Sequence, residues 1–552
     1  MKQKKQVIRQ DAFAQSCASI TSNVISFFLL ILVFVFPLFL HNSYFDILET
    51  KYSFFYISVL AMTGILLVSG IIMARIDLKE YQGVHIKKMF AALAPKNWRS
   101  TFSIADIAII IFWAVSVIST LQSEYLYEAF WGNEGRYSGL FLMTLYVLLY
   151  FLVSRFWKFK GWILEAFLCA SLPVSFLGIT DYFQMDIMHF RVNVNPYQLT
   201  IFTSTLGNIN TYTAYIALVI GLTTAMYATT RNKAKIIWYY FCMVVSFFAI
   251  ITGNSDNAYL ALGALFAFLP LFIFRSKEGI LRYFIIIATF ATTIQCIDWL
   301  NQAYAGVVIG VDSLFKVLVN LPGLSFIIAA LWILAGLIWL LLYKNEHLKD
   351  KEALISKYLI RTWTGLLIAA FLLLCFLLID ANMLGHGDRY GSLSSYLVFN
   401  DQWGTKRGYV WRKTLEIYGK FPFIHKLFGY GPDTFGILTT QNYMEEMVNT
   451  TGFIFDTVHN EYLQFLITIG PIALAAYLVF LISSGIDTAK YLKKSVALHP
   501  QSSLNTYSIG CMFAIICYCF QAFVNLNLPI TAPLMWILAS VGVSAIRTKE
   551  ID

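Results

Sequence analysis

The chain has 552 residues, of which 58% are hydrophobic, 17% aromatic and 13% charged. Ordinary soluble domains carry about twice this share of charged residues, so the composition excludes a soluble enzyme and predicts a polytopic membrane protein. The formal net charge of +9 needs no nucleic-acid partner, because most lysines and arginines fall in the loops on one side of the predicted membrane.

Apolar stretches of about 17 to 25 residues, long enough to cross a bilayer, recur along the whole chain. They begin near Ile20, Tyr52, Ser103, Ser138, Gly161, Ile209, Ile236, Asn257, Gly279, Pro322, Ile360, Leu463, Thr506 and Pro529. The sequence therefore predicts an all-α membrane protein with about fourteen transmembrane helices. The first apolar run lacks a small-residue cleavage site, which predicts an anchor and not a removed signal peptide.

Basic runs such as HIKKMFAALAPKNWR and TTRNKAK mark every second loop. The positive-inside rule then predicts that both termini are cytoplasmic. One long outer loop is an exception to the rule, because it contains seven lysines and arginines where the rule predicts few. The chain divides accordingly into a membrane region of about eleven spans (1–380), an extracytoplasmic loop with amphipathic helices (381–456) and a second membrane region of about three spans (457–552).

The long outer loop contains most of the candidate chemistry. Trp411, Leu415 and Tyr418 recur at helical spacing on the same face as Arg407. This pattern predicts an amphipathic helix at the membrane surface with its aromatic face buried and its arginine available to an acidic group. A Gly-Tyr-Gly-Pro turn follows, and His459 stands where hydrophobicity resumes.

Four polar residues in the other outer loops have a structural and a functional interpretation. Arg136 lies between glycines in an aromatic loop, which suits either a membrane-interface turn or a phosphate contact. Asn208 and Asn210 open a predicted span, where amides cap helices but also suit sugar hydroxyls. Asp256 is the only charge in a tight turn. No role is predicted for residues 301–320.

Two absences narrow the function. The eight cysteines lie in or beside predicted spans, so neither a disulfide framework nor a metal site is predicted. Ionisable residues are scarce within the spans, Glu165 and Asp298 being the nearest cases, which disfavours an ion-coupled transporter. A lipid-linked oligosaccharide flippase remains the main alternative, although it predicts two similar halves and no such repeat is visible.

Four segments together carry a resemblance to a known family: GNINTYTAYIAL, KRGYVWRKTLEIYGKFPFIHKLFGYGPDTFG, VHNEYLQFLITIGPIAL and NLNLPITAPLMWILASVG. In this order the chain, over about 206–542, resembles the O-antigen ligase and polymerase superfamily of polytopic glycosyltransferases with a C-type fold. The resemblance implies transfer of a saccharide from an undecaprenyl-diphosphate carrier to an acceptor outside the bacterial cytoplasmic membrane. The outer loops have no Asp-x-Asp to hold a divalent cation, so we expect no metal and no cofactor. The acceptor stays open between a glycan, a lipid, a protein and a wall polymer.

The resemblance also implies residue roles. Arg407 matches the arginine thought to hold the carrier diphosphate, and His459 matches the histidine regarded as catalytic. Trp411, Asn460 and Tyr462 match pattern positions and are expected near the substrate. Many ligases carry an arginine in the turn that here reads GNSDNAY. A second diphosphate cation must then come from elsewhere in this chain, and the available residues are Arg136, Arg389 and Arg412.

Physical chemistry agrees with the two central roles. A guanidinium can neutralise a departing diphosphate through paired hydrogen bonds. His459 is predicted to lie in the first turn of a helix, where the positive end of the dipole keeps the imidazole neutral. A neutral imidazole can accept a proton from an acceptor hydroxyl. On its position alone, the same histidine would be an interfacial cap.

Overall fold

The computed structural model describes residues 2–344, 352–499 and 502–548. The basic segment after Lys344, which the sequence places on the inner side, therefore lies partly outside the described residues. The longer helices of the first half are α1 (Lys2–Leu30), α3 (Ile47–Tyr81), α4 (Val84–Leu93), α6 (Ile104–Leu121), α7 (Leu126–Trp131), α8 (Leu140–Phe151), α9 (Trp162–Tyr182), α10 (Ile209–Thr229), α11 (Lys233–Thr252), α12 (Asn257–Ile273) and α13 (Lys277–Ala303).

The second half continues with α14 (Ser313–Val319), α15 (Leu324–Lys344), α17 (Glu352–Asn382), α18 (Ser394–Leu397), α19 (Trp403–Lys420), α20 (Phe423–Phe428), α21 (Phe435–Thr451), α22 (Glu461–Leu498), α23 (Ser503–Gln521) and α24 (Ala532–Arg547). Short helical pieces join them, namely η1 (Ile31–Val35), α2 (Phe36–Leu38), η2 (Pro95–Asn97), α5 (Trp98–Thr101), η3 (Leu152–Phe156), η4 (Pro196–Ile201), η5 (Gly387–Leu393) and η6 (Ala522–Val524). The two-residue strands β1 (Phe202–Thr203) and β2 (Gly207–Asn208) pair antiparallel.

The all-α membrane architecture is confirmed. Among the described residues, 11 helices are long and apolar enough to cross a membrane, and three shorter apolar helices, Leu140–Phe156, Asn257–Ile273 and Ala532–Arg547, complete the set. Each of the fourteen predicted spans corresponds to one of these helices. A continuous apolar helix suits the bilayer core, because its backbone polar groups are all hydrogen-bonded within the helix.

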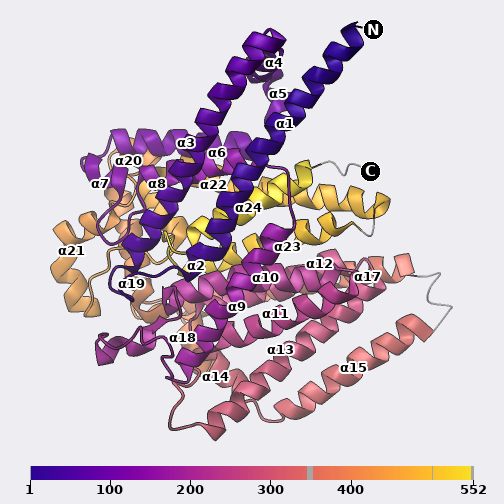
Figure 1. Ribbon diagram of the computed structural model, residues 1–552. Coiled ribbons are helices and arrows are strands. Elements are labelled where there is room, and N and C mark those ends of the chain that lie inside the picture. The colour runs from indigo at the N-terminus through magenta and orange to yellow at the C-terminus, as the bar shows by residue number, and fades with distance from the viewer. Residues whose placement is uncertain (1, 345–351, 500–501, 549–552) are drawn as a thin grey trace.

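Burial separates the helices at the centre of the bundle from those at its edge. In α10, 89% of the apolar window is buried inside the protein, whereas the corresponding share is 6% in α15 and 0% in α17. The side chains of α15 and α17 therefore face the surroundings, which suits contact with lipid. Figure 1 shows α15 at the margin of the bundle.

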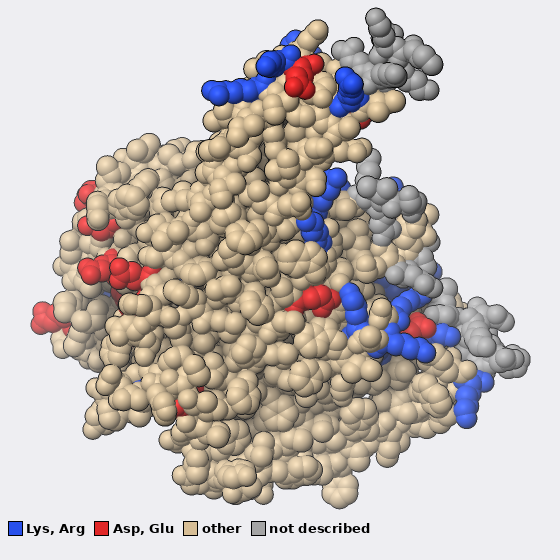
Figure 2. Space-filling view, viewed as in Figure 1, with Lys and Arg blue, Asp and Glu red and all other residues tan. Residues whose placement is uncertain are grey.

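The loop helices α19, α20 and α21 gather at one end of the bundle, while both chain termini point toward the other end (Figure 1). Figure 2 shows a matching charge asymmetry: basic side chains collect toward the end with the termini, and the visible charges around α7 and α21 are mostly acidic. The loop helices have their own small core, made of Tyr409, Val410, Ile417, Phe421, Phe435, Leu438, Met447, Val458 and Ile467. This core fixes the long loop against the membrane helices.

The buried face of α19 differs from the predicted one. Tyr409, Val410 and Ile417 are buried on this helix, whereas Leu415 is 51% exposed and Trp411 and Tyr418 are only half-buried. The sequence pattern misassigned the face because Lys413, whose ammonium pairs with Glu446 at 2.7 Å, is buried on the same side. A paired lysine hides the apolar stripe from a count of hydrophobic residues.

The Gly-Tyr-Gly-Pro turn packs against a break in α22. Gly470 interrupts that helix with φ 82° and ψ 168°, which leaves carbonyl groups without partners in the helix. The turn supplies these partners, because Tyr430 N donates to Ile467 O at 3.1 Å and Gly431 N donates to Thr468 O at 2.8 Å. A Cβ on Gly429 would approach the carbonyl carbon of Thr468 to 2.3 Å. The glycines therefore allow close backbone contact next to the site.

Candidate active site

Two cavities lie on either side of the segment that leads into α22. The larger one has a volume of about 490 Å³ and is bordered by Asn210, Asp256, Arg407 and His459. The structure therefore brings four predicted site residues, which span about 250 positions in the sequence, to the same cavity. Two of them lie in α10 and α19, and the other two lie in the segments directly before α12 and α22, so the site forms where the long loop meets the bundle.

Arg407 is a buried cation with few partners. Arg407 is 9% exposed. Its guanidinium makes one hydrogen bond among the described residues, from Nη1 to Gly404 O at 3.4 Å. Burial lowers the pKa of Arg407, and the Asp256 carboxylate acts in the opposite direction. Desolvating a guanidinium without pairing it costs free energy. Such an arrangement is typical of an anion-binding site.

The entrance to α19 is strained. Three consecutive residues, Gly404, Thr405 and Lys406, have positive φ of 57°, 59° and 70°, a conformation that costs about 1 to 2 kcal/mol for each non-glycine residue. Contacts outside the helix hold it, since Lys406 Nζ donates to Thr451 O and lies 4.8 Å from the ring centre of Phe453. Strain of this kind concentrates at functional sites, and here it places Thr405 and Arg407 on the cavity wall.

His459 lies two residues before α22, directly before its cap, and not in its first turn, which corrects the predicted position. Asn460 is the cap of α22, and its side chain accepts from the backbone N–H groups of Tyr462 and Leu463, each at 3.0 Å. The pKa of His459 is lowered to about 3, first by burial and then by the positive charges of Arg407 and Arg136. This shift favours the neutral imidazole, and its causes are burial and neighbouring cations and not the helix dipole.

Backbone contacts fix His459 in its unusual conformation, with φ 53°. The preceding Val458 is held on both sides, because its N–H donates to Gln464 Oε1 at 3.0 Å and its carbonyl accepts from Trp411 Nε1 at 3.1 Å. Trp411 therefore links the helix that carries Arg407 to the segment that carries His459. Phe455 adds an edge contact to the imidazole, with ring centres 5.7 Å apart.

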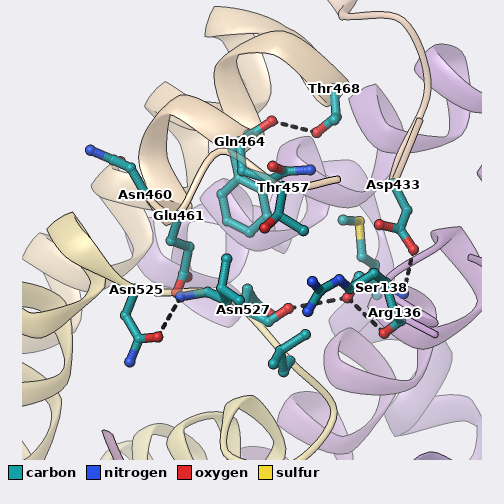
Figure 3. A pocket seen from close by; sticks show the side chains of 14 residues that line it. Arg136, Ser138, Asp433, Thr457, Asn460, Glu461, Gln464, Thr468, Asn525 and Asn527 are labelled. Atoms are coloured by element: carbon teal, nitrogen blue, oxygen red, sulfur yellow. Dashed lines mark hydrogen bonds between the residues drawn. The ribbon is translucent and has the colours of Figure 1, made fainter. Parts of the chain in front are cut away.

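The smaller cavity, of about 30 Å³, lies on the other side of the same segment. Figure 3 shows Arg136, Asp433, Thr457 and Asn460 around it. Thr457 and Asn460 border this cavity while His459, between them, borders the larger one. The segment therefore forms a wall, with the imidazole on the side of Arg407.

Arg136 takes part in the wall and not in the larger cavity. Its guanidinium binds Asp456 through two hydrogen bonds, Nε to Oδ2 at 2.9 Å and Nη2 to Oδ1 at 2.7 Å. The loop that carries it is fixed by Asp433, whose carboxylate accepts from Asn133 N at 2.8 Å and from Ser138 N at 3.0 Å. Paired geometry of this kind is the strong form of an arginine-carboxylate contact, and it anchors the chain three residues before His459.

Asp433 makes the wall sensitive to pH. Its burial raises the pKa to about 7, above the ordinary value near 3.9. Because the folded protein keeps this proton while the unfolded chain loses it, Asp433 should lower stability progressively as pH rises from about 4 to 7. Asp433→Asn keeps an oxygen acceptor for both N–H groups and removes the ionisation.

We therefore expect the thermal midpoint of Asp433→Asn, relative to wild type, to be higher at pH 8 than at pH 5. Thermal unfolding in detergent at the two pH values measures this difference. Asp433→Ala serves as the contrast, since it leaves two buried donors unpaired and should destabilise the protein at both pH values. Parallel pH profiles of wild type and Asp433→Asn would show that the carboxylate does not titrate in this range.

The remaining predicted site residues lie outside the lining of the larger cavity. Arg412 pairs with Asp401, with both hydrogen bonds at 2.8 Å, and Arg389 is exposed in η5. Tyr462 donates its hydroxyl to Cys519 O at 2.7 Å. Asn208 caps α10 by accepting from Asn210 N at 2.8 Å. Neither Arg412 nor Arg389 is therefore placed beside Arg407 as a second cation.

Several lining residues have no sequence signal of their own. Asp312 borders the cavity, although the sequence predicted no role for residues 301–320. Its backbone N–H donates to Asn254 Oδ1 at 2.9 Å, and this hydrogen bond joins the two loops. Phe453 and Phe455 supply aromatic faces, and Tyr259 a hydroxyl. Of these lining residues, only Phe453 and Phe455 had a signal in the sequence, because they are aromatic and lie directly before His459.

Part of the chain is similar to a known protein family. Residues 323–478 match the family model described as O-antigen ligase, a segment that runs from α15 through Arg407 and His459 to the middle of α22. A search of curated proteins found no matching sequence. The family supports a ligase or glycosyltransferase role in polysaccharide assembly. The match over this segment supports membership of the O-antigen ligase superfamily.

Proposed function

We propose that this protein transfers a saccharide from an undecaprenyl-diphosphate carrier to a hydroxyl acceptor on the outer side of the bacterial cytoplasmic membrane. The observation that supports the proposal most directly is the shared cavity, in which a buried and weakly bonded Arg407 faces the same space as a neutral His459. An anion-binding group and a proton acceptor are the two elements that such a transfer needs.

In the proposed reaction the acceptor oxygen attacks the anomeric carbon of the donor. A new carbon–oxygen bond forms, while the bond from that carbon to the diphosphate oxygen breaks and its electron pair leaves with the diphosphate. Arg407 stabilises the charge that accumulates on the leaving group. The imidazole of His459 takes the proton of the attacking hydroxyl.

The other lining residues suit a sugar. Asn254, Ser255 and Tyr259 line the cavity with polar side chains that hydrogen-bond to its other walls, and Phe453 and Phe455 line it with aromatic rings. Aromatic rings pack against the apolar CH surfaces of sugars, while amides and carboxylates bind the hydroxyl groups. Asp256 is placed among these polar groups, and we assign it to sugar hydroxyls and not to the diphosphate, which it would repel.

The proposed orientation puts the long loop outside and both termini inside. Glu445 is exposed on α21 and Lys494 is exposed near the end of α22, so single cysteines at these positions are accessible. In a background without the native cysteines, a membrane-impermeant thiol reagent added to intact cells should label Glu445→Cys and leave Lys494→Cys unlabelled until the cells are permeabilised. The reverse pattern would place the cavity on the cytoplasmic side and contradict the outer reaction.

Transfer should proceed without a divalent cation, because Arg407 supplies the positive charge at the leaving group. Purified protein in nanodiscs, supplied with lipid-linked donor and a range of acceptors, should form product at similar rates with magnesium and with excess chelator. Product is measured by the shift of labelled glycan from lipid to acceptor. Loss of product in chelator and its recovery with magnesium or manganese would show that a metal, and not arginine alone, neutralises the diphosphate.

A further inference from the structure

A separate cavity of about 310 Å³ lies far from the candidate active site. The C-terminal ends of α10, α12 and α22 and the N-terminal regions of α13 and α23 form it. None of the residues that border it also borders the cavities at His459. It is therefore distinct from the candidate active site.

The position of this cavity along the helices sets its depth in the membrane. Ile209, the first residue of α10, borders the His459 cavity, and Thr229, the last, borders the separate cavity. A helix of 21 residues is about 30 Å long at 1.5 Å per residue, which equals the thickness of a typical hydrocarbon core. The two cavities therefore lie at opposite membrane surfaces, each at the level of lipid headgroups.

The lining carries a strong positive charge. Arg231, Arg275, Arg282 and Lys493 border the cavity, and Glu278 is the one acidic residue among the described residues that line it. Figure 2 shows basic side chains gathered at this end of the bundle. Arg282 is fixed in place, because its Nη1 donates to the carbonyls of Tyr227 at 2.7 Å and Thr230 at 2.5 Å. A preorganised cation binds an anion with less loss of side-chain entropy.

Part of the wall is apolar. Phe272, Ile273, Leu492, Val496 and Ile509 also border the cavity, and Val496 is 47% exposed. The positive-inside rule explains basic residues on this surface, but it does not require them to surround a hollow with hydrophobic walls. A phosphate beside the cations, with hydrocarbon along the apolar side chains, satisfies both parts of the lining.

We propose that this cavity binds the headgroup phosphate of an anionic membrane phospholipid in the leaflet opposite to the candidate active site. The charge of the lining selects an anion, and the headgroup depth and apolar wall select a lipid over a free ion. This assignment is independent of the proposed glycosyl transfer, because it rests on different residues at the other end of the helices.

Lipid binding to the full chain tests the proposal. Protein delipidated in a neutral detergent is titrated with phosphatidylglycerol, phosphatidylcholine or inorganic phosphate, and bound lipid is counted by native mass spectrometry. The test variant is Arg231→Gln combined with Arg275→Gln, since both residues are exposed and Arg282, which caps α10, stays intact. The matched control is Lys490→Gln combined with Lys494→Gln, which removes two exposed cations near the same end of α22 but outside the cavity.

We expect one phosphatidylglycerol to bind more tightly than phosphatidylcholine, and the test variant to weaken this binding about fivefold for each cation removed. The control should bind as wild type does. An equal loss in both double variants would mean that general surface charge attracts the lipid, and it would overturn the proposal. Inorganic phosphate that displaces phosphatidylglycerol at equimolar concentration would assign the site to a free anion and overturn it as well.

Discussion

His459→Ala should lower the rate of glycan transfer by about 10² to 10⁴, the usual cost of losing a general base, while donor affinity stays close to that of wild type. The reason is the placement of the imidazole, which borders the cavity together with Arg407 but carries no charge to attract a diphosphate. Single-turnover transfer with purified protein measures the rate. Equilibrium binding of lipid-linked donor measures the affinity, and cells with the variant should accumulate unused donor.

Controls must separate chemistry from backbone strain, because His459 has a positive φ that alanine adopts at a cost of about 1 kcal/mol or more. Asparagine tolerates this conformation better, so His459→Asn should fold well and still transfer slowly. His189 is an exposed histidine with a φ of 54° outside the cavity, so His189→Ala is the matched control and should transfer normally. A well-folded His459→Asn with wild-type rate would leave His459 as a structural residue before the helix cap.

The same histidine predicts the pH profile. With its pKa lowered to about 3, the imidazole stays in its neutral, proton-accepting form as pH falls from 8 to 5, whereas a free histidine would become protonated near pH 6.5. We therefore expect kcat/KM to show no inflection near pH 6.5 in that range. An inflection there that disappears in His459→Asn would show that the imidazole is more exposed to water in the working enzyme.

Arg407→Ala should weaken donor binding and lower the transfer rate further, by about 10² to 10³, because its guanidinium meets charge that grows as the bond breaks. Arg407 is buried and makes only one long hydrogen bond to the residues that the structure describes, so little of this loss should come from a broken internal contact. Donor titration combined with single-turnover rates separates the two effects. If Arg407→Ala binds donor with wild-type affinity and transfers at the wild-type rate, Arg407 has no role in donor binding or transfer.

Charge and geometry can be distinguished at this position. Arg407→Lys retains the charge and loses the paired donors, so it should be impaired less than Arg407→Ala and still fall below wild type. Arg412 is the matched control, since it lies on the same helix α19 and is already paired with Asp401 outside the cavity. Arg412→Gln should transfer normally. A loss as large as that of Arg407→Ala would instead identify Arg412 as the second diphosphate cation.

The sequence by itself determined the membrane class and the number of spans, and it predicted two central residues. Long apolar runs specify transmembrane helices almost without reference to tertiary contacts, because every backbone polar group in hydrocarbon must bond within its own helix. Arg407 and His459 were identified by the motifs around them, and the family match over residues 323–478 contains both. These features are local, and local features are visible in a sequence.

The tertiary structure decided which residues share the site. Asp312 reaches the cavity only through its loop contact with Asn254, and Arg136 is excluded from it by pairing with Asp456. A sequence lists cations but does not show which of them a neighbouring carboxylate neutralises. The buried face of α19 was hidden for the same reason, since the pairing of Lys413 with Glu446 brings two segments together that lie 33 residues apart. Pairing between distant residues is a property of the packed chain.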